Sequence, residues 1–174
     1  MKKIITTAVL AILFSMTSLA QTPLKGSWSI SQSMMGTKIT DILSFDNDIQ
    51  GQATNKFVID MKISTFGVKI IGSAEITIKG DFTSEGDKLT INWEQDSFEA
   101  TQTPIELYVM GEKVEDDKEE YEDMMGDIIR EIKDEIKIEG PDEYYNVRVR
   151  GDKLLMTSKG ENGKEETDKF TRVK

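Results

Sequence analysis

Hydrophobic and polar residues alternate along the middle of the chain, from Val68 to Phe82. The even-numbered positions are Val, Ile, Gly, Ala, Ile, Ile, Gly and Phe, and six of the seven odd-numbered positions are polar. A period of two puts the even positions on one face, which predicts a β-strand with one buried face. The strand would be unusually long, and Gly72 and Gly80 are positions where it can bend. Long, bent strands are typical of small closed barrels.

Shorter runs with the same period flank this strand. Their apolar members are Phe57, Ile59, Met61 and Ile63; Leu89, Ile91 and Trp93; Ile105, Leu107 and Val109; and Tyr145, Val147 and Val149. With shorter apolar pairs near both ends, they predict about nine strands in an antiparallel sandwich or barrel. The pairs Gly86-Asp87 and Gly151-Asp152 are expected at hairpin tips, because both residue types tolerate the backbone of tight turns.

One segment instead repeats its apolar residues at spacings of three and four. These residues are Tyr121, Met124, Met125, Ile128, Ile129, Ile132 and Ile136. They predict a single amphipathic helix over about residues 116–138, followed by Gly140-Pro141 as a stop. The apolar stripe must dock on another element, with the barrel wall or mouth the nearest candidate. We expect a fixed structural helix, and a lid over the barrel mouth is the alternative that Met124-Met125-Gly126 suggests.

Negative charge is concentrated around this helix. Of the 32 acidic residues in the chain, 15 lie between Glu112 and Glu143, among five Lys or Arg residues. The chain has only 22 basic residues, so nucleic acid and anionic lipid are poor partners. We interpret the acidic block as a solvated helix face, and a docking surface for a basic partner or for calcium is the alternative.

The absence of His and Cys removes several kinds of chemistry. Disulfides, thiolate ligands, imidazole acid–base catalysis and the usual zinc ligands are all excluded. Asp46-Asn47-Asp48 begins like a calcium loop, but Phe57 occupies the twelfth position, where a bidentate Glu is needed, so a hairpin turn is expected. No catalytic motif is present, and we expect no enzymatic activity, no metal site and no cofactor.

The first twenty residues differ from the rest of the chain. Lys2 and Lys3 precede an apolar run of about thirteen residues, and Ser18-Leu19-Ala20 fits a cleavage site. The run is too short to cross a bilayer as a helix. The pattern resembles a bacterial secretory signal, which implies a periplasmic or secreted protein. We therefore expect residues 1–20 to be a signal peptide and residues 21–174 to form one domain, with no membrane span after cleavage.

Gly26-Ser27-Trp28 opens the first expected strand. It resembles the Gly-x-Trp signature of the lipocalin-like (calycin) β-barrel family, and the whole chain is similar to the small secreted lipocalin-like proteins of Gram-negative bacteria. The resemblance implies an eight-stranded up-and-down barrel in which Trp28 closes one end. It also implies that Arg172, on the last strand, lies across the Trp28 ring and gains a cation–π contact.

The expected fold is therefore an all-β, antiparallel, up-and-down calycin-like barrel of about 8–9 strands, with one amphipathic α-helix inserted before the last three strands. Such barrels often hold one small ligand. The expected function is an exported, non-enzymatic protein that binds a small apolar molecule in or at the barrel mouth. The candidate ligand-binding residues are Met34, Met35, Met61, Met124, Met125 and Tyr145.

The alternative function is a protein–protein interaction or inhibitor module, with a solid barrel core and an acidic helix face that meets a partner. The volume of the barrel interior discriminates between the two functions. A cavity of about 300 Å³ or more favours the binding protein, and a filled core favours the interaction module.

Overall fold

The structure, a computed structural model, describes residues 23–34, 36–114, 122–123, 125–127, 129–130, 133, 140–160 and 163–174, with only the backbone of Met34. Within these ranges the chain forms eleven β-strands, one 3₁₀ turn and a helical segment. The expected signal peptide, residues 1–20, lies outside the described residues.

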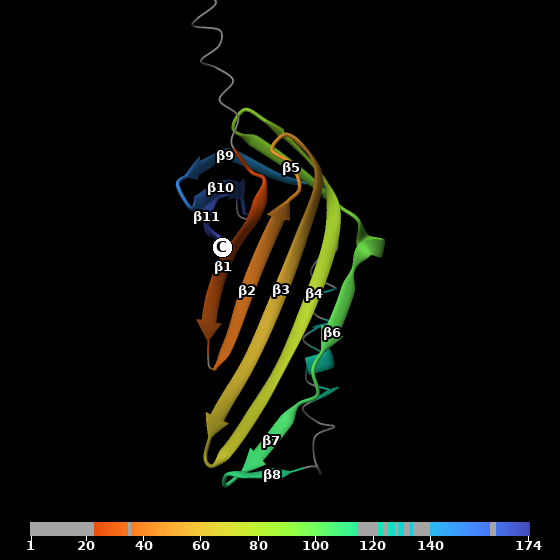
Figure 1. Ribbon diagram of the computed structural model, residues 1–174, viewed down its shortest axis with the longest axis vertical. Coiled ribbons are helices and arrows are strands. Elements are labelled where there is room, and N and C mark those ends of the chain that lie inside the picture. The colour runs from red at the N-terminus through yellow and green to blue at the C-terminus, as the bar shows by residue number, and fades with distance from the viewer. Residues whose placement is uncertain are drawn as a thin grey trace, which may run out of the picture.

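Eight of the strands close into an antiparallel barrel (Figure 1). In order around the barrel they are β1 (Gly26–Met34), β2 (Thr37–Phe45), β3 (Gln50–Thr65), β4 (Val68–Glu85), β5 (Lys88–Trp93), β9 (Asp142–Arg150), β10 (Lys153–Lys159) and β11 (Glu165–Arg172). Each strand pairs with the next one in this order, and β11 pairs with β1 to close the ring. The prediction of an all-β, antiparallel, up-and-down barrel is confirmed, and the architecture is compatible with a calycin-like fold.

The long strand predicted from the alternating pattern is β4, which spans 18 residues and buries alternate side chains. One edge of β4 pairs with β3 from Val68 to Thr83. The other edge changes partner and pairs with β5 from Gly80 onward. At Gly80 an added Cβ would collide with the carbonyl oxygen of Asn92, so a side chain there would push the two strands apart. The expected hairpin tips at Gly86-Asp87 and Gly151-Asp152 are confirmed as the β4–β5 and β9–β10 turns.

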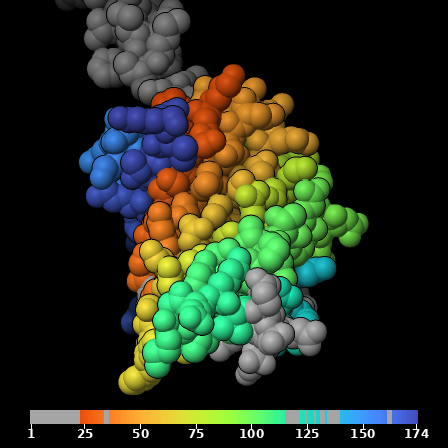
Figure 2. Space-filling view, turned by 60° about the horizontal axis from the view of Figure 1, so that its bottom comes forward, coloured from red at the N-terminus to blue at the C-terminus, as the bar shows by residue number. Residues whose placement is uncertain are grey.

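The part of β4 that extends beyond the barrel carries the remaining strands (Figure 1). These elements are the 3₁₀ turn η1 (Gln95–Ser97) and the strands β6 (Glu99–Gln102), β7 (Glu106–Val109) and β8 (Glu112–Val114). Strands β6 and β7 pair with β4, and β8 pairs with β7. Figure 2 shows the green residues of β6–β8 at the opposite end of the molecule from the blue residues of β9–β11. The run from Ile105 to Val109 therefore contributes to this extension and not to the barrel.

The buried apolar residues form two separate clusters. The barrel core consists of Leu24, Trp28, Leu43, Phe45, Ala53, Phe82, Leu89, Ile91, Val147, Leu154, Met156 and Phe170. The extension core consists of Ile59, Met61, Ile70, Ala74, Ile76, Ile105, Leu107 and Met125. Because β3 and β4 contribute to both clusters, these two strands join the barrel to the extension.

The helical segment docks on the extension. The described residues between 122 and 133 are all helical, and Met125 is buried in the extension core. Ile129 packs against the same core, and the ammonium group of Lys133 lies 5.2 Å from the ring centre of Phe98. From the sequence, the barrel wall or mouth is the nearest candidate for docking. The described helical residues dock on β3 and β4, where these strands extend beyond the barrel, and on β7. The other members of the predicted stripe, including Tyr121 and Met124, lie outside the described residues. In the described part of the chain, no helix is long and apolar enough to cross a membrane.

One end of the barrel is closed by Trp28, which is fully buried. Its indole Nε1 donates a hydrogen bond to the Leu24 carbonyl oxygen at 2.8 Å. The Arg172 guanidinium carbon lies 4.1 Å from the centre of the Trp28 ring, and Arg172 also donates a hydrogen bond to the Lys25 carbonyl oxygen at 3.2 Å. This is the geometry that the Gly-x-Trp resemblance implies, and it seals one end of the barrel.

Candidate ligand-binding site

A cavity of about 270 Å³ lies inside the barrel, where the two cores meet. We call it the lumen cavity. Its lining residues are Ile30, Gln32, Ile39, Asp41, Leu43, Asn55, Phe57, Trp93, Tyr144, Met156, Asp168 and Phe170. Leu43, Met156 and Phe170 belong to the barrel core, whereas Phe57 packs against the extension core. The cavity therefore lies between the part of the barrel core around Trp28 and the extension core.

Strand alternation and register bring the lining residues together. Ile30 of β1 pairs with Asp41 of β2, and Leu43 of β2 pairs with Asn55 of β3. Paired residues of neighbouring strands point to the same face of a sheet. Asp168 pairs in the same way with Met156. Four strands, β1, β2, β3 and β11, thus each place one polar side chain among inward-facing apolar ones.

The lumen cavity borders the seam between β1 and β11. The two strands pair only at Trp28–Arg172 and Ser29–Thr171 in the described residues. Ile30 and Asp168 lie beyond this short paired stretch, and Asp168 is exposed.

Asp41 and Asn55 form the polar centre of the cavity. The Asn55 side chain donates a hydrogen bond to the Asp41 carboxylate, which partly offsets two larger effects on this group. Burial, and after it the negative charge of Asp168, raise the pKa of Asp41 from 3.8 to about 6. The Oδ1 atoms of both Asp41 and Asn55 are buried, and neither has a hydrogen-bond partner among the described residues. Native structures satisfy almost all buried polar atoms, so this pair is exceptional.

Tyr144 and Trp93 form one wall and are both attached to Asp142. The Trp93 indole Nε1 donates a hydrogen bond to Asp142 Oδ2 at 2.7 Å, and the Tyr144 hydroxyl also bonds to this carboxylate. Burial is the main cause of a raised pKa of Tyr144, followed by the negative charges of Asp142, Asp168 and Asp41. Tyr144 is therefore a neutral aromatic wall. Burial, and then Glu166, raise the pKa of Asp168.

A β-bulge places Tyr144, and not Tyr145, in the lumen cavity. Two steps along β10, from Leu155 to Thr157, correspond to three steps along β9, from Arg148 to Tyr145. The extra residue changes which side chains face inward, and the positive φ of 54° at Asn146 falls within the irregular stretch. Regular alternation had predicted that Tyr145 shares the buried face of Val147. Tyr145 instead lines an open hollow outside the barrel, of about 920 Å³, whose other lining residues are mostly charged or polar.

The methionine candidates do not gather at the lumen cavity. Met61 and Met125 are buried in the extension core, and neither lines the cavity. Met61 also lines a surface hollow of about 590 Å³ between the extension strands. The side chain of Met34, and all of Met35 and Met124, lie outside the described residues. The residues that the sequence interpretation missed are Asp41, Asn55, Trp93, Tyr144 and Asp168.

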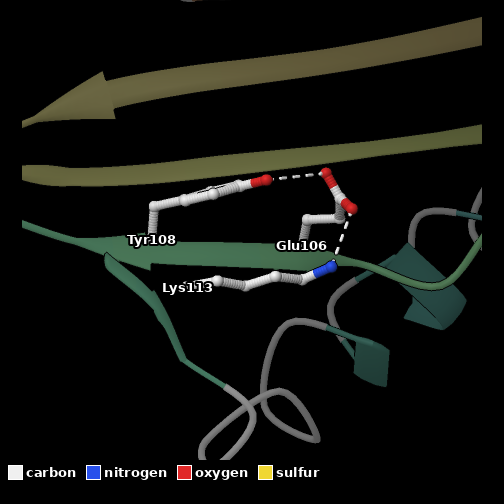
Figure 3. Close-up of polar contacts among 3 residues, drawn as sticks. All are labelled: Glu106, Tyr108 and Lys113. Carbon is white, nitrogen blue, oxygen red and sulfur yellow. Dashed lines mark hydrogen bonds and ion pairs between the residues drawn. The ribbon is translucent and has the colours of Figure 1, made fainter. Parts of the chain in front are cut away.

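The polar cluster on β7 and β8 contrasts with the lumen (Figure 3). Glu106 accepts a hydrogen bond from the Tyr108 hydroxyl at 3.2 Å and one from the Lys113 ammonium at 2.9 Å. The Lys69 ammonium lies 5.2 Å from the centre of the Tyr108 ring. Each charge here faces an opposite charge or an aromatic ring at the surface. This cluster ties β4, β7 and β8 together, whereas the lumen carboxylates face no cationic side chain among the lining residues.

Comparisons of the chain with models of protein families, with curated proteins and with solved structures found no match.

Proposed function

We propose that this protein is an exported, non-enzymatic member of the lipocalin-like barrels that holds one small, largely apolar molecule in the lumen cavity. The observation that carries the proposal is the cavity itself, which lies inside a closed barrel and is walled mainly by aliphatic and aromatic side chains. Export is supported by the pattern of residues 1–20, and kinship with lipocalins by Trp28 and Arg172.

The volume of the lumen cavity sets the size of the ligand. An apolar cavity of about 150 Å³ holds one benzene molecule, and drug-sized ligands occupy about 300–1,000 Å³. At about 270 Å³, the lumen cavity lies just below the value expected for a typical binding protein and suits one ring with a short chain. The larger hollow beside Tyr145 is open and polar, so it would bury less of a ligand.

The alternative, an interaction module, places the function on the acidic helix. Most of that helix lies outside the described residues, and the barrel is filled only around Trp28 and not at the lumen cavity. The lumen cavity of about 270 Å³ falls slightly short of the value of about 300 Å³ given above for a binding protein. The lumen is nevertheless not a filled core, which supports a binder of a smaller molecule.

The test combines native mass spectrometry with a cavity-filling variant. Protein purified from its source should retain a small molecule, and benzene and 2-phenylethanol should change the fluorescence of Trp93, which lines the cavity. Ile30→Phe fills the lumen and should abolish both signals. Ile42→Phe, the same change on the neighbouring strand at a position outside the cavity lining, is the matched control. Unchanged binding in Ile30→Phe, or no retained molecule and no response to either probe, would contradict the proposal.

A further inference from the structure

We propose that the ligand of the lumen cavity is a small primary amine, whose ammonium group is held by Asp41, Asn55 and Asp168 and whose apolar body packs on the aromatic wall. This inference rests on the proposed function and names the ligand class of the same site.

The unpartnered atoms of the cavity identify the missing group as a hydrogen-bond donor. Asp41 Oδ1 and Asn55 Oδ1 are both acceptors, and both are buried without a partner among the described residues. The Asn55 amide has two N–H donors, and one of them bonds to the Asp41 carboxylate, yet Asp41 Oδ1 has no partner among the described residues. The ionised Asp41 carboxylate has no donor to offer to Asn55 Oδ1. An ammonium group carries three donors and no acceptor, which matches Asp41 Oδ1, Asn55 Oδ1 and the nearby carboxylate of Asp168.

The charge of the cavity selects a cation over a neutral donor. Asp41 and Asp168 both line the lumen cavity, and its described lining contains neither Lys nor Arg. Two carboxylates in a partly desolvated space repel each other and any anionic ligand. A hydroxyl group would supply one donor but leave this charge uncompensated. A cation compensates the charge and forms charge-assisted hydrogen bonds at the same time.

The walls of the cavity suit the rest of such a ligand. Phe57, Trp93, Tyr144 and Phe170 place four aromatic rings around the carboxylates. Aromatic faces attract cations and also bury apolar groups. The described residues contain no group of three or more acidic side chains that could hold a metal ion, so an organic cation fits this donor set better than a metal.

The ionisation of Asp41 supplies a second signature of amine binding. The groups that face Asp41 are Asp168 of β11, Tyr144 of β9, Asn55 of β3 and Gln32 of β1, with Asp142 behind Tyr144. None of them is cationic, and the pKa of Asp41 is raised to about 6 in the unliganded protein. Protonation of Asp41 removes the charge that the ammonium requires. Affinity for an amine should therefore fall by about tenfold from pH 7.5 to pH 5, a range in which an alkyl ammonium stays ionised.

The test uses three probes that share a phenyl ring and a two-carbon chain, namely 2-phenylethylamine, 2-phenylethanol and phenylacetate. Calorimetric titration of the purified protein in phosphate buffer at pH 7.5 should give at least tenfold tighter binding of the amine than of the alcohol. Phenylacetate should not bind measurably.

Asp41→Asn should weaken binding of 2-phenylethylamine at least tenfold and leave binding of 2-phenylethanol within about twofold. Asp81→Asn, which neutralises an exposed carboxylate of β4 outside the cavity lining, is the matched control and should bind both probes like the unmodified protein. Circular dichroism of each variant verifies that the barrel is intact.

The outcomes separate this inference from the proposed function. If the alcohol binds as tightly as the amine, or if Asp41→Asn and acidification leave amine binding unchanged, the amine inference is wrong and the apolar binder stands. If no probe binds and the protein retains no small molecule, both proposals are wrong.

Discussion

Neutralising Asp41 should make the unliganded protein more stable. The carboxylate lies in the lumen cavity, where burial and the charge of Asp168 raise its pKa from 3.8 to about 6. Asparagine has nearly the same shape, carries no charge and can donate to the unpartnered Asn55 Oδ1. The Asp41→Asn variant therefore removes an unfavourable charge without leaving a cavity.

The magnitude follows from the linkage between proton binding and folding. A shift of about two pKa units corresponds to about 3 kcal/mol of free energy of unfolding, which the ionised carboxylate costs at pH 7. Because the pKa is higher in the folded state, the folded protein binds the proton more tightly than the unfolded chain. The free energy of unfolding should thus fall as the pH rises from about 4 to about 6 and stay level for this group above that. In Asp41→Asn this dependence should disappear.

Urea denaturation at pH 5 and pH 7.5, followed by circular dichroism in phosphate buffer free of amines, measures both effects. At pH 7.5 Asp41→Asn should exceed the unmodified protein by up to about 3 kcal/mol, and the difference should shrink toward pH 4. Asp81→Asn on the exposed face of β4 controls for the general loss of negative charge. An Asp41→Asn protein that is no more stable at pH 7.5, or that keeps the full pH dependence, would refute this account of the cavity.

Four further substitutions test the rest of the architecture. Trp28→Ala should lower the free energy of unfolding by about 3–5 kcal/mol and the Tm by roughly 10 °C, measured by thermal denaturation. A Tm within two degrees of the original would show that Trp28 does not close the barrel. Gly80→Ala should destabilise the protein by about 1–3 kcal/mol, because the new Cβ meets the Asn92 carbonyl. Gly126 lies in the helical segment with open space around it, so Gly126→Ala should stabilise the protein by up to about 1 kcal/mol. If the helix is permanently docked, Met125→Ala should lower the free energy of unfolding by about 2–5 kcal/mol, measured by urea denaturation. If the helix is a loosely held lid, the decrease should be much smaller.

Alternation along single strands could be read from the sequence, but the way strands combine could not. The buried face of β4 and the turns at Gly86 and Gly151 follow from local patterns, because a period of two and positive φ are properties of neighbouring residues. The change of partner along β4 is a property of the whole sheet. Gly80 indicates that another strand comes close at this position, but the sequence does not indicate which strand it is.

The candidate site shows the same division. Ile39, Asp41 and Leu43 occupy every second position of one strand and so share a face. A polar residue on an inward face was therefore visible in the sequence. Its companions Asn55 and Asp168 come from other strands, and only the register brings them together. Met61 and Met125 lie in the filled extension core, which suits flexible apolar side chains as well as a pocket does.

The lumen cavity is lined by Tyr144 and not by the predicted Tyr145, and this difference has another cause. One additional residue in β9 reverses the facing of all side chains before it, and a single sequence does not show where a bulge occurs.

The chain leaves the barrel after β5 and returns to it at β9, and these two strands are direct neighbours, joined at Leu89–Tyr144 and Ile91–Asp142. In topological terms the whole extension is thus an insertion into a single hairpin, and a short turn could replace it without changing the order of the barrel strands. The overhanging ends of β3 and β4 prevent so simple a deletion, because Ile59, Ile70 and Ile76 would then lose their cover and face water. The length of the β3–β4 hairpin and the presence of the insertion are therefore structurally coupled, because each covers the apolar residues of the other. A shortened relative of this protein should lack both.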